Sequence, residues 1–251
     1  MMLPTRIVLI LLGAAVATSP TALTAPAVSS EIRQADLTAA RSELARVQAA
    51  MGGAGELTKI TSLRISSTAS RWASNGQPRK RPEKRVLHML LPNYVLFEIE
   101  GDPRRGWAVS EPIANPGEPA ASKALLKDAF AYVALRTLLR TDTPMPLTLR
   151  AFTNGSLQHD APNGVKVFLD IDPQTHLPSR LHYVDIGRSN AGDPIPGTSI
   201  SQRWDLEDYR VVGKVRLAHR WTWFFNEMRA TVDTVDAIEM NPPMTPKDFV
   251  K

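Results

Sequence analysis

Apolar and polar residues alternate over much of the chain, and this period of two is typical of β-strands with one buried face. The clearest run begins at Leu63, from which apolar or small residues recur at every second position to Ala69. Asn-Gly pairs at 154–155 and 163–164 predict tight hairpins, because both central residues of that turn need a positive φ. The predicted strands are 63–70, 85–91, 94–100, a short one with Trp107 and Val109, several after Leu147 that include 165–169 and 181–183, and long ones at 200–209, 215–225 and 228–238. We therefore count about eleven antiparallel strands.

Two segments have the helical period instead. The first is capped by Asp36 and stops at Gly52, and its apolar residues recur at spacings of three and four: Leu37, Ala40, Leu44, Val47 and Met51. The second, 122–140, is the most helical segment of the chain, and Pro144 prevents its continuation. Its wide apolar face comprises Leu125, Leu126, Ala129, Phe130, Val133, Leu138 and Leu139.

Eleven strands in consecutive hairpins must curl to bury one face, and a helix between the fourth and fifth strands can cover the open side. The predicted fold class is therefore mainly β (α+β), a curved antiparallel sheet or half-barrel closed by an N-terminal helix and a lid helix. We expect a flexible N-terminus over 28–35 and a single domain over 36–251, because no repeat or linker divides the chain. If the lid does not interlock with the sheet, an apolar cavity remains between them.

The first 27 residues have the features of a secretory signal peptide. Arg6 is their only charge, an apolar run occupies 7–17, and Ala25 and Ala27 form a small-residue cleavage site. The apolar run is too short to span a bilayer core of about 30 Å. We therefore expect a cleaved signal at 1–27 and a periplasmic or secreted mature protein, with an uncleaved membrane anchor as the alternative.

Composition narrows the possible chemistry. The chain has no cysteine, which excludes disulfides, thiolate metal sites and cysteine catalysis. Its formal net charge is +5, and one basic cluster stands out: Arg79, Lys80, Arg81, Lys84 and Arg85. Asn75, Gly76, Pro78 and Pro82 lie in and around the cluster, which favours a solvated hairpin loop. Transient contact with an anionic surface such as phospholipid is the alternative. In an exported protein, nucleic acid is not an expected partner.

Catalytic and metal-binding patterns are missing from the sequence. It contains no zinc-binding helix with two histidines four residues apart, no nucleophile elbow and no phosphate-binding loop. His176 and His182 lie near acidic residues, but their spacing matches no known ligand signature. Ser156, His159 and Asp160 are close in sequence, yet one strand turns alternate side chains to opposite faces, so we interpret them as polar hairpin residues. We predict neither an enzyme nor a metal or cofactor.

Five stretches, in order along residues 50–250, resemble the LolA-like envelope carriers. The most distinctive reads Asp-Pro-Gln-Thr-His-Leu-Pro-Ser-Arg-Leu at 172–181. The others are 51–53 with 60–63, the pair 92–93, the turn at 101–107, and an ending made of 208–209, 217–220, 239–243 and Phe249. The resemblance implies a curved eleven-stranded antiparallel sheet closed by helices over a hydrophobic cavity. The founding members of that family carry lipoproteins between membranes by holding their acyl chains.

One position departs from the family pattern. The founding carriers have an arginine just before the Pro-Asn turn, which latches the lid, whereas this chain has Leu91. Our first hypothesis is a soluble, monomeric periplasmic carrier of a lipid or lipidated protein. The residues expected to line the cavity and lid are Val95, Phe97, Leu125, Ala129, Phe130, Val133, Trp204, Trp221 and Trp223.

Ordinary sheet packing is the competing interpretation of these aromatic residues. If that interpretation holds, the chain is a protein-interaction module that keeps the fold with a filled core. A hydrolase is the third candidate function. A pocket of about 300 Å³ or more would favour the carrier, and interlocked side chains would favour the filled module.

Overall fold

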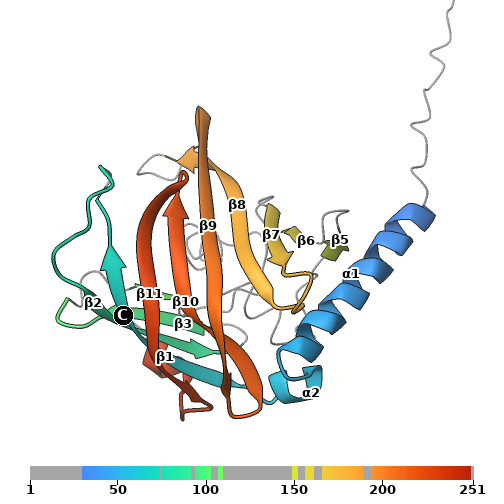
Figure 1. The fold of residues 1–251 in the computed structure, drawn as a ribbon, viewed down its shortest axis with the longest axis horizontal. Helices are drawn as coiled ribbons and strands as arrows, with labels where there is room; N and C mark the ends of the chain where they lie inside the picture. The colour runs from blue at the N-terminus through green and yellow to red at the C-terminus, as the bar shows by residue number, and fades with distance from the viewer. Residues whose placement is uncertain are drawn as a thin grey trace, which may run out of the picture.

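The computed structural model of the protein describes residues 30–73, 75–91, 94–102, 107–109, 149–151, 156–160, 166–188 and 194–249. Within them, eleven strands form one antiparallel sheet in the order β4-β3-β2-β1-β11-β10-β9-β8-β7-β6-β5 (Figure 1). The strands are β1 (Ser62–Arg71), β2 (Glu83–Leu90), β3 (Tyr94–Ile99), β4 (Trp107–Val109), β5 (Leu149–Ala151), β6 (Ser156–Asp160), β7 (Lys166–Ile171), β8 (Pro178–Arg188), β9 (Pro194–Val212), β10 (Val215–Phe225) and β11 (Met228–Met240). The predicted mainly β (α+β) fold with about eleven antiparallel strands is confirmed.

The pairing of β1 with β11 joins the two halves of the sheet, so β4 and β5 become its opposite edges. Asn241, directly after β11 and with a φ of 56°, fixes this junction. Its side-chain oxygen accepts a hydrogen bond from the Thr61 backbone N–H at 2.8 Å, and its own N–H donates to the Ser62 carbonyl at 2.8 Å. The Ser62 hydroxyl donates to the Pro242 carbonyl at 2.7 Å. The segment after β11 therefore holds the first strand in register.

Helix α1 (Ser30–Ala50) packs chiefly against β5 and places Ala40, Leu44, Val47 and the following Met51 in the core. It begins at Ser30 rather than at Asp36, so most of the stretch 28–35, predicted to be flexible, is helical. The apolar stripe starts only at Leu37, and the polar turns before it carry no periodic signal.

Two short helices complete the described structure, and no described helix is long and apolar enough to cross a membrane. Helix α2 (Ala54–Leu57) follows α1, and the 3₁₀ helix η1 (Pro246–Phe249) packs against β3. Phe249 is fully buried, with its ring centroid 5.7 Å from that of Tyr94. The predicted lid helix, 122–140, lies outside the described residues.

The turn after α1 docks onto the β9–β10 hairpin. The Arg216 N–H donates to the Met51 carbonyl at 2.7 Å. Gly52, with a φ of +123°, lies so close that a Cβ atom there would be 2.4 Å from the backbone oxygen of Lys214. Only glycine satisfies both the positive φ and the close approach, which explains why the helix ends where the sequence predicted.

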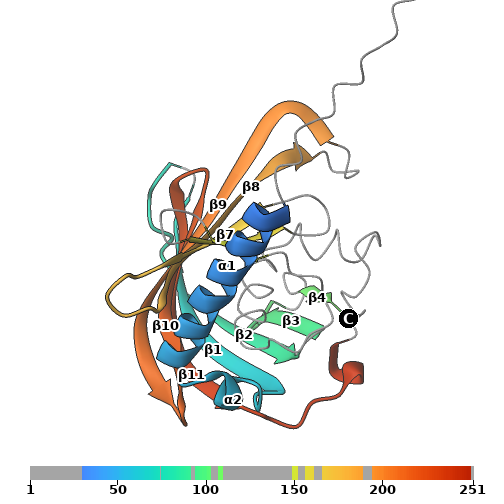
Figure 2. The same cartoon turned by 90° about the vertical axis from the view of Figure 1, so that its right-hand side faces the viewer.

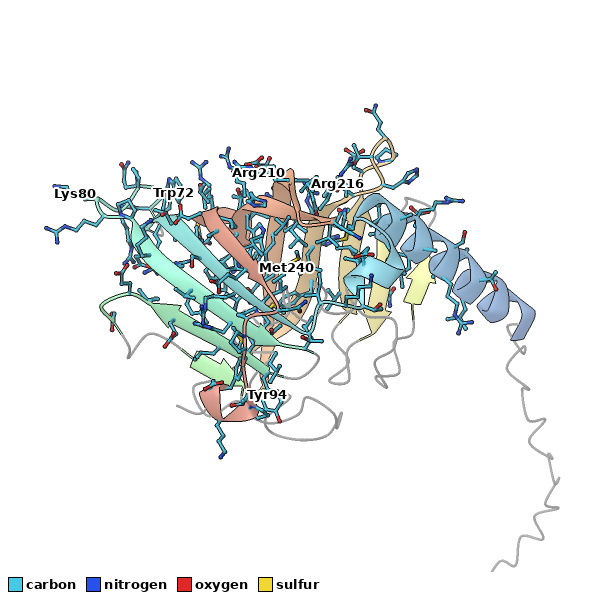
Figure 3. All side chains as sticks on the ribbon, turned by 90° about the horizontal axis from the view of Figure 1, so that it is seen from below. Trp72, Lys80, Tyr94, Arg210, Arg216 and Met240 are labelled. Carbon is cyan, nitrogen blue, oxygen red and sulfur yellow. The ribbon has the colours of Figure 1, made fainter. Side chains whose placement is uncertain are left out.

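The sheet bends into a trough, with β10 on one side and β3 on the other (Figure 2). Seen from below with its side chains, the same sheet forms an arch (Figure 3). Along β1 the residues predicted to alternate do so, because Leu63, Ile65, Ser67 and Ala69 are buried and the intervening residues are more exposed. One hydrophobic core links this strand to β7–β11 and to α1, and the site described next lies within it.

Candidate functional site

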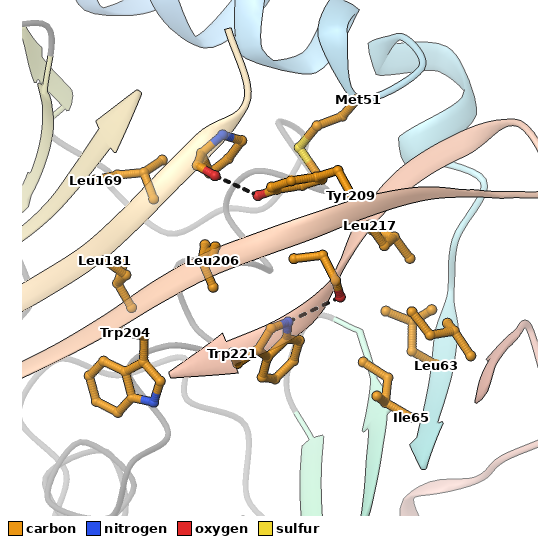
Figure 4. Close-up of a pocket in the computed structure, with 13 residues that line it drawn as sticks. Met51, Leu63, Ile65, Leu169, Leu181, Trp204, Leu206, Tyr209, Leu217 and Trp221 are labelled. Atoms are coloured by element: carbon orange, nitrogen blue, oxygen red, sulfur yellow. Dashed lines mark hydrogen bonds between the residues drawn. The ribbon is translucent and has the colours of Figure 1, made fainter. Parts of the chain in front are cut away.

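The core contains a cavity of about 40 Å³, bounded by six strands of the sheet, β1 and β7 to β11, and by Met51 directly after α1 (Figure 4). One water needs about 10–15 Å³ in this measure, so the space holds roughly three waters. The lining residues are almost all apolar: Met51, Leu63, Ile65, Leu169, Pro178, Leu181, Trp204, Leu206, Tyr209, Leu217, Ala218, Trp221 and Ile238.

The polar atoms of the two amphipathic lining residues are hydrogen-bonded within the wall itself. The Tyr209 hydroxyl donates to the Pro178 carbonyl at 2.8 Å, and the Trp221 indole N–H donates to the Ala218 carbonyl at 3.1 Å. Both bonds are drawn in Figure 4. Burial also raises the pKa of Tyr209, so its phenol stays neutral. The cavity therefore presents an apolar surface to a ligand, and the hydrogen-bond donors of these two rings are already used.

A row of aromatic rings crosses β8, β9 and β10 beside the cavity. Trp204 lies between Tyr183 and Trp223, with ring centroids 5.9 Å and 6.2 Å away, both in stacked arrangements. Phe225 continues the row by an edge contact with Trp223 at 6.3 Å. Trp204 and Trp223 are register partners, which places them on the same face of neighbouring strands.

A second, smaller cavity of about 20 Å³ adjoins the first, because Ile65 and Trp221 line both. Its other lining residues are Ser67, Arg85, Leu87, Phe97, Asp233 and Val235. Arg85 donates to both carboxylate oxygens of Asp233, at 3.2 and 3.1 Å. Burial raises the pKa of Asp233 against the opposing influence of Arg85. This end of the trough is thus polar.

The predicted cavity residues divide into groups. Trp204 and Trp221 line the larger cavity, Phe97 lines the smaller one, and Trp223 stacks on Trp204. Val95 is buried in the common core. The four predicted lid residues lie outside the described part of the chain: Leu125, Ala129, Phe130 and Val133.

Leu91, the position at which the founding carriers have an arginine, is buried in the hydrophobic core. Its backbone N–H donates to the Thr61 carbonyl at 2.9 Å. The apolar side chain therefore contributes packing where the family pattern has a charge.

The five basic residues predicted to form one surface are separated by the sheet. Arg85 points into the trough and is ion-paired, and Lys84 bonds Asp236 at 3.0 Å on the other face. The remaining three, 79–81, are exposed in the β1–β2 loop, from which Lys80 projects in Figure 3. Burial thus removes Arg85 from any exposed cationic surface.

The polar residues around the β6–β7 hairpin pair with one another across strands. The Ser156 hydroxyl donates to Asp170 at 2.6 Å, and His182 Nε2 lies 3.3 Å from the same carboxylate. These contacts, with the His182 bond first, lower the pKa of Asp170. In the described part of the chain, no group of three or more His, Asp or Glu side chains is arranged to hold a metal ion.

Sequence reasoning missed most of the aliphatic wall. The wall includes Leu63 and Ile65 on β1, Leu169 on β7 and Leu181 on β8, which occupy alternating positions of predicted strands. That alternation was the available signal, but it does not say which strands meet across a bend. The concentration of aromatic residues on β9 and β10 therefore predicts Trp204 as a lining residue, but not its aliphatic neighbours on the other strands.

The class of protein that the structure defines is a mainly β protein with the architecture that the resemblance implied, a curved eleven-stranded antiparallel sheet with a helix packed beside it. Solved structures similar to the chain include a LolA superfamily protein from Nitrosomonas europaea, at 11% identity and a TM-score of 0.47 over 84% of this chain and 97% of that one. A putative outer membrane lipoprotein-sorting protein domain from Vibrio parahaemolyticus matches at 12% identity and a TM-score of 0.46, over 86% and 97% of the two chains. A DUF1329 family protein from Desulfovibrio piger matches at 9% identity and a TM-score of 0.43, also over 86% and 97%. No family model and no curated protein sequence matches this chain.

Proposed function

We propose that this protein is a non-catalytic carrier that binds the acyl chain of a lipid or lipidated protein against the inner face of its sheet. The observation that supports the proposal is the wall of the larger cavity, whose lining is apolar and whose Tyr209 and Trp221 donors are already used within the wall. Each methylene group removed from water contributes about 0.8 kcal/mol, so a chain of several carbons supplies enough free energy for binding.

The carrier must open to accept such a chain, because the cavity of about 40 Å³ is far smaller than the roughly 300 Å³ of ordinary ligand pockets. We propose that the four predicted lid residues, Leu125, Ala129, Phe130 and Val133, line the opened site together with Trp204 and Trp221. We also propose that the protein works as a monomer in the periplasm after loss of residues 1–27, and that the exposed cations at 79–81 meet anionic phospholipid.

The small volume favours a second candidate, a protein-interaction module on the same fold with a filled core. Lipid extraction and mass spectrometry after purification from a membrane-bearing host separate the two candidates. The carrier is expected to retain acyl lipid and to take up a fluorescent fatty acid. Repeated absence of both signals would reject the carrier in favour of the filled module.

A pair of variants on β9 locates the binding. Leu206 is a half-buried cavity residue, and Val211 on the same strand is 67% exposed. Leu206→Gln is expected to weaken uptake of the fluorescent fatty acid at least tenfold, because it puts an amide in the apolar wall. Val211→Gln is expected to leave uptake unchanged. Should Leu206→Gln prove unfolded by circular dichroism, Leu206→Phe tests the same wall by filling it.

A further inference from the structure

The smaller cavity contains a buried donor that the protein itself does not satisfy. Arg85 uses its two terminal nitrogens on Asp233 and Glu83, with distances of 3.1–3.2 Å. Its Nε atom is also buried, yet it has no hydrogen-bond partner within the described part of the chain. A buried donor without an acceptor is costly, and such groups are rare in folded proteins. The unmet requirement at this position is a hydrogen-bond acceptor.

The charges around that donor are balanced. Arg85 and Arg71 carry the positive charges, and Asp233 and Glu83 carry the negative ones, with Arg71 3.0 Å from Glu83. An anionic group brought into this cluster would therefore remain an uncompensated charge in a partly dehydrated place. An uncharged acceptor, such as an ester or amide carbonyl, would satisfy the donor without that penalty.

The position of the cluster relates it to the apolar site. Ile65 and Trp221 line both cavities. One ligand could therefore lie against the apolar wall and place a polar group beside Arg85, with these two side chains in contact with both of its parts. Both residues are labelled in Figure 4. An apolar wall that continues into a neutral polar end is complementary to an amphiphile with a short uncharged head.

Resting on the proposed carrier function, we propose that Arg85 binds the uncharged carbonyl head of an acyl ester or amide whose chain occupies the apolar cavity. The ligand class is therefore a neutral acyl ester or amide, as opposed to a free fatty acid or a hydrocarbon. Asp233 and Glu83 position the guanidinium, and Arg71 continues to neutralise Glu83 if Arg85 is replaced.

The test compares three ligands of equal chain length, an alkane, its methyl ester and its carboxylate, by displacement of the neutral dye N-phenyl-1-naphthylamine from the full chain. For the wild type, we expect the ester to bind about tenfold or more tightly than the carboxylate, because one hydrogen bond to a charged group is gained and no charge is buried. In Arg85→Met/Asp233→Asn, the preference for the ester over the alkane is expected to fall about tenfold.

The matched control is Lys84→Met/Asp236→Asn, which removes an exposed ion pair from the same two strands. It is expected to keep the wild-type order of affinities. An unchanged ester preference in Arg85→Met/Asp233→Asn, or tighter binding of the carboxylate than of the ester by the wild type, would overturn the inference while leaving the carrier intact. Failure of all three ligands to bind the wild type would overturn the carrier proposal and this inference with it. The wild-type ranking decides the question even if the Arg85 variant does not fold.

Discussion

Trp204 offers a quantitative test of the aromatic row beside the cavity. Its side chain is 6% exposed and stacks between Tyr183 and Trp223. A buried tryptophan removes about 150–250 Å² from water, which at about 25 cal/mol per Å² corresponds to roughly 4–6 kcal/mol as an upper bound. Because alanine keeps the Cβ atom and the neighbours relax in part, we expect Trp204→Ala to lower the free energy of unfolding by about 3–5 kcal/mol.

Guanidinium unfolding followed by circular dichroism measures this loss, and Val211→Ala on the same strand is the control. Val211 is 67% exposed, so its truncation is expected to change stability by less than about 0.5 kcal/mol. Added indole should partly restore Trp204→Ala, by up to about 2.7 kcal/mol at a hundredfold excess over its dissociation constant, and leave the wild type unchanged. A loss below about 1 kcal/mol for Trp204→Ala would refute the assignment of this ring to a packed core.

Three further predictions concern the docking turn, an ion pair and the exposed loop. Gly52→Ala is expected to lower the free energy of unfolding by about 1–3 kcal/mol more than Gly53→Ala, because both positions have a positive φ but only the first would contact the Lys214 backbone. Asp170 has a lower pKa in the folded protein than in the unfolded chain, where the pKa of an aspartate is about 4. The ionised carboxylate therefore stabilises the fold above that pH, and this contribution is lost as the pH falls through the pKa of the folded state. Asp170→Asn should therefore flatten the loss of thermal stability on acidification below about pH 5. Replacing the three cations at 79–81 by serine should weaken co-sedimentation with anionic phospholipid vesicles roughly a hundredfold, since each exposed cation contributes about 1 kcal/mol at such a surface.

The controls for these predictions are direct. An equal decrease in the free energy of unfolding for Gly52→Ala and Gly53→Ala would contradict the first prediction. It would show that the turn can move away from the β9–β10 hairpin without destabilising the protein. An acid-stability profile of Asp170→Asn that coincides with the wild-type profile would contradict the assigned role of this carboxylate. For the loop, the wild type should not bind zwitterionic vesicles, and high salt should abolish its binding to anionic ones. Equal binding of the wild type and the triple serine variant would show that the loop is merely solvated.

The strands could be predicted from the sequence because their signal is local. The alternation that begins at Leu63 and the aromatic run 221–225 each report on a face of a single strand, and those faces are the ones found in the sheet. The sequence pattern predicts a later start for α1 than Ser30, because the first turns of the helix, before Leu37, have no apolar stripe to reveal them. The pairing of β1 with β11 joins residues about 170 positions apart, such as Arg64 and Glu239, and no local pattern encodes it.

The sequence by itself determined the strand count, the fold class and the apolar character of the inner face, because period and residue type are enough for these. Only the tertiary structure decided which residues share a cavity, since that depends on how far the sheet bends and which strands the bend brings together. It placed Arg85 inside the trough beside Asp233 while its sequence neighbour Lys84 stayed outside. Adjacent residues of a strand point to opposite faces, so a cluster of charges in the sequence became one exposed loop, one surface ion pair and one buried polar site.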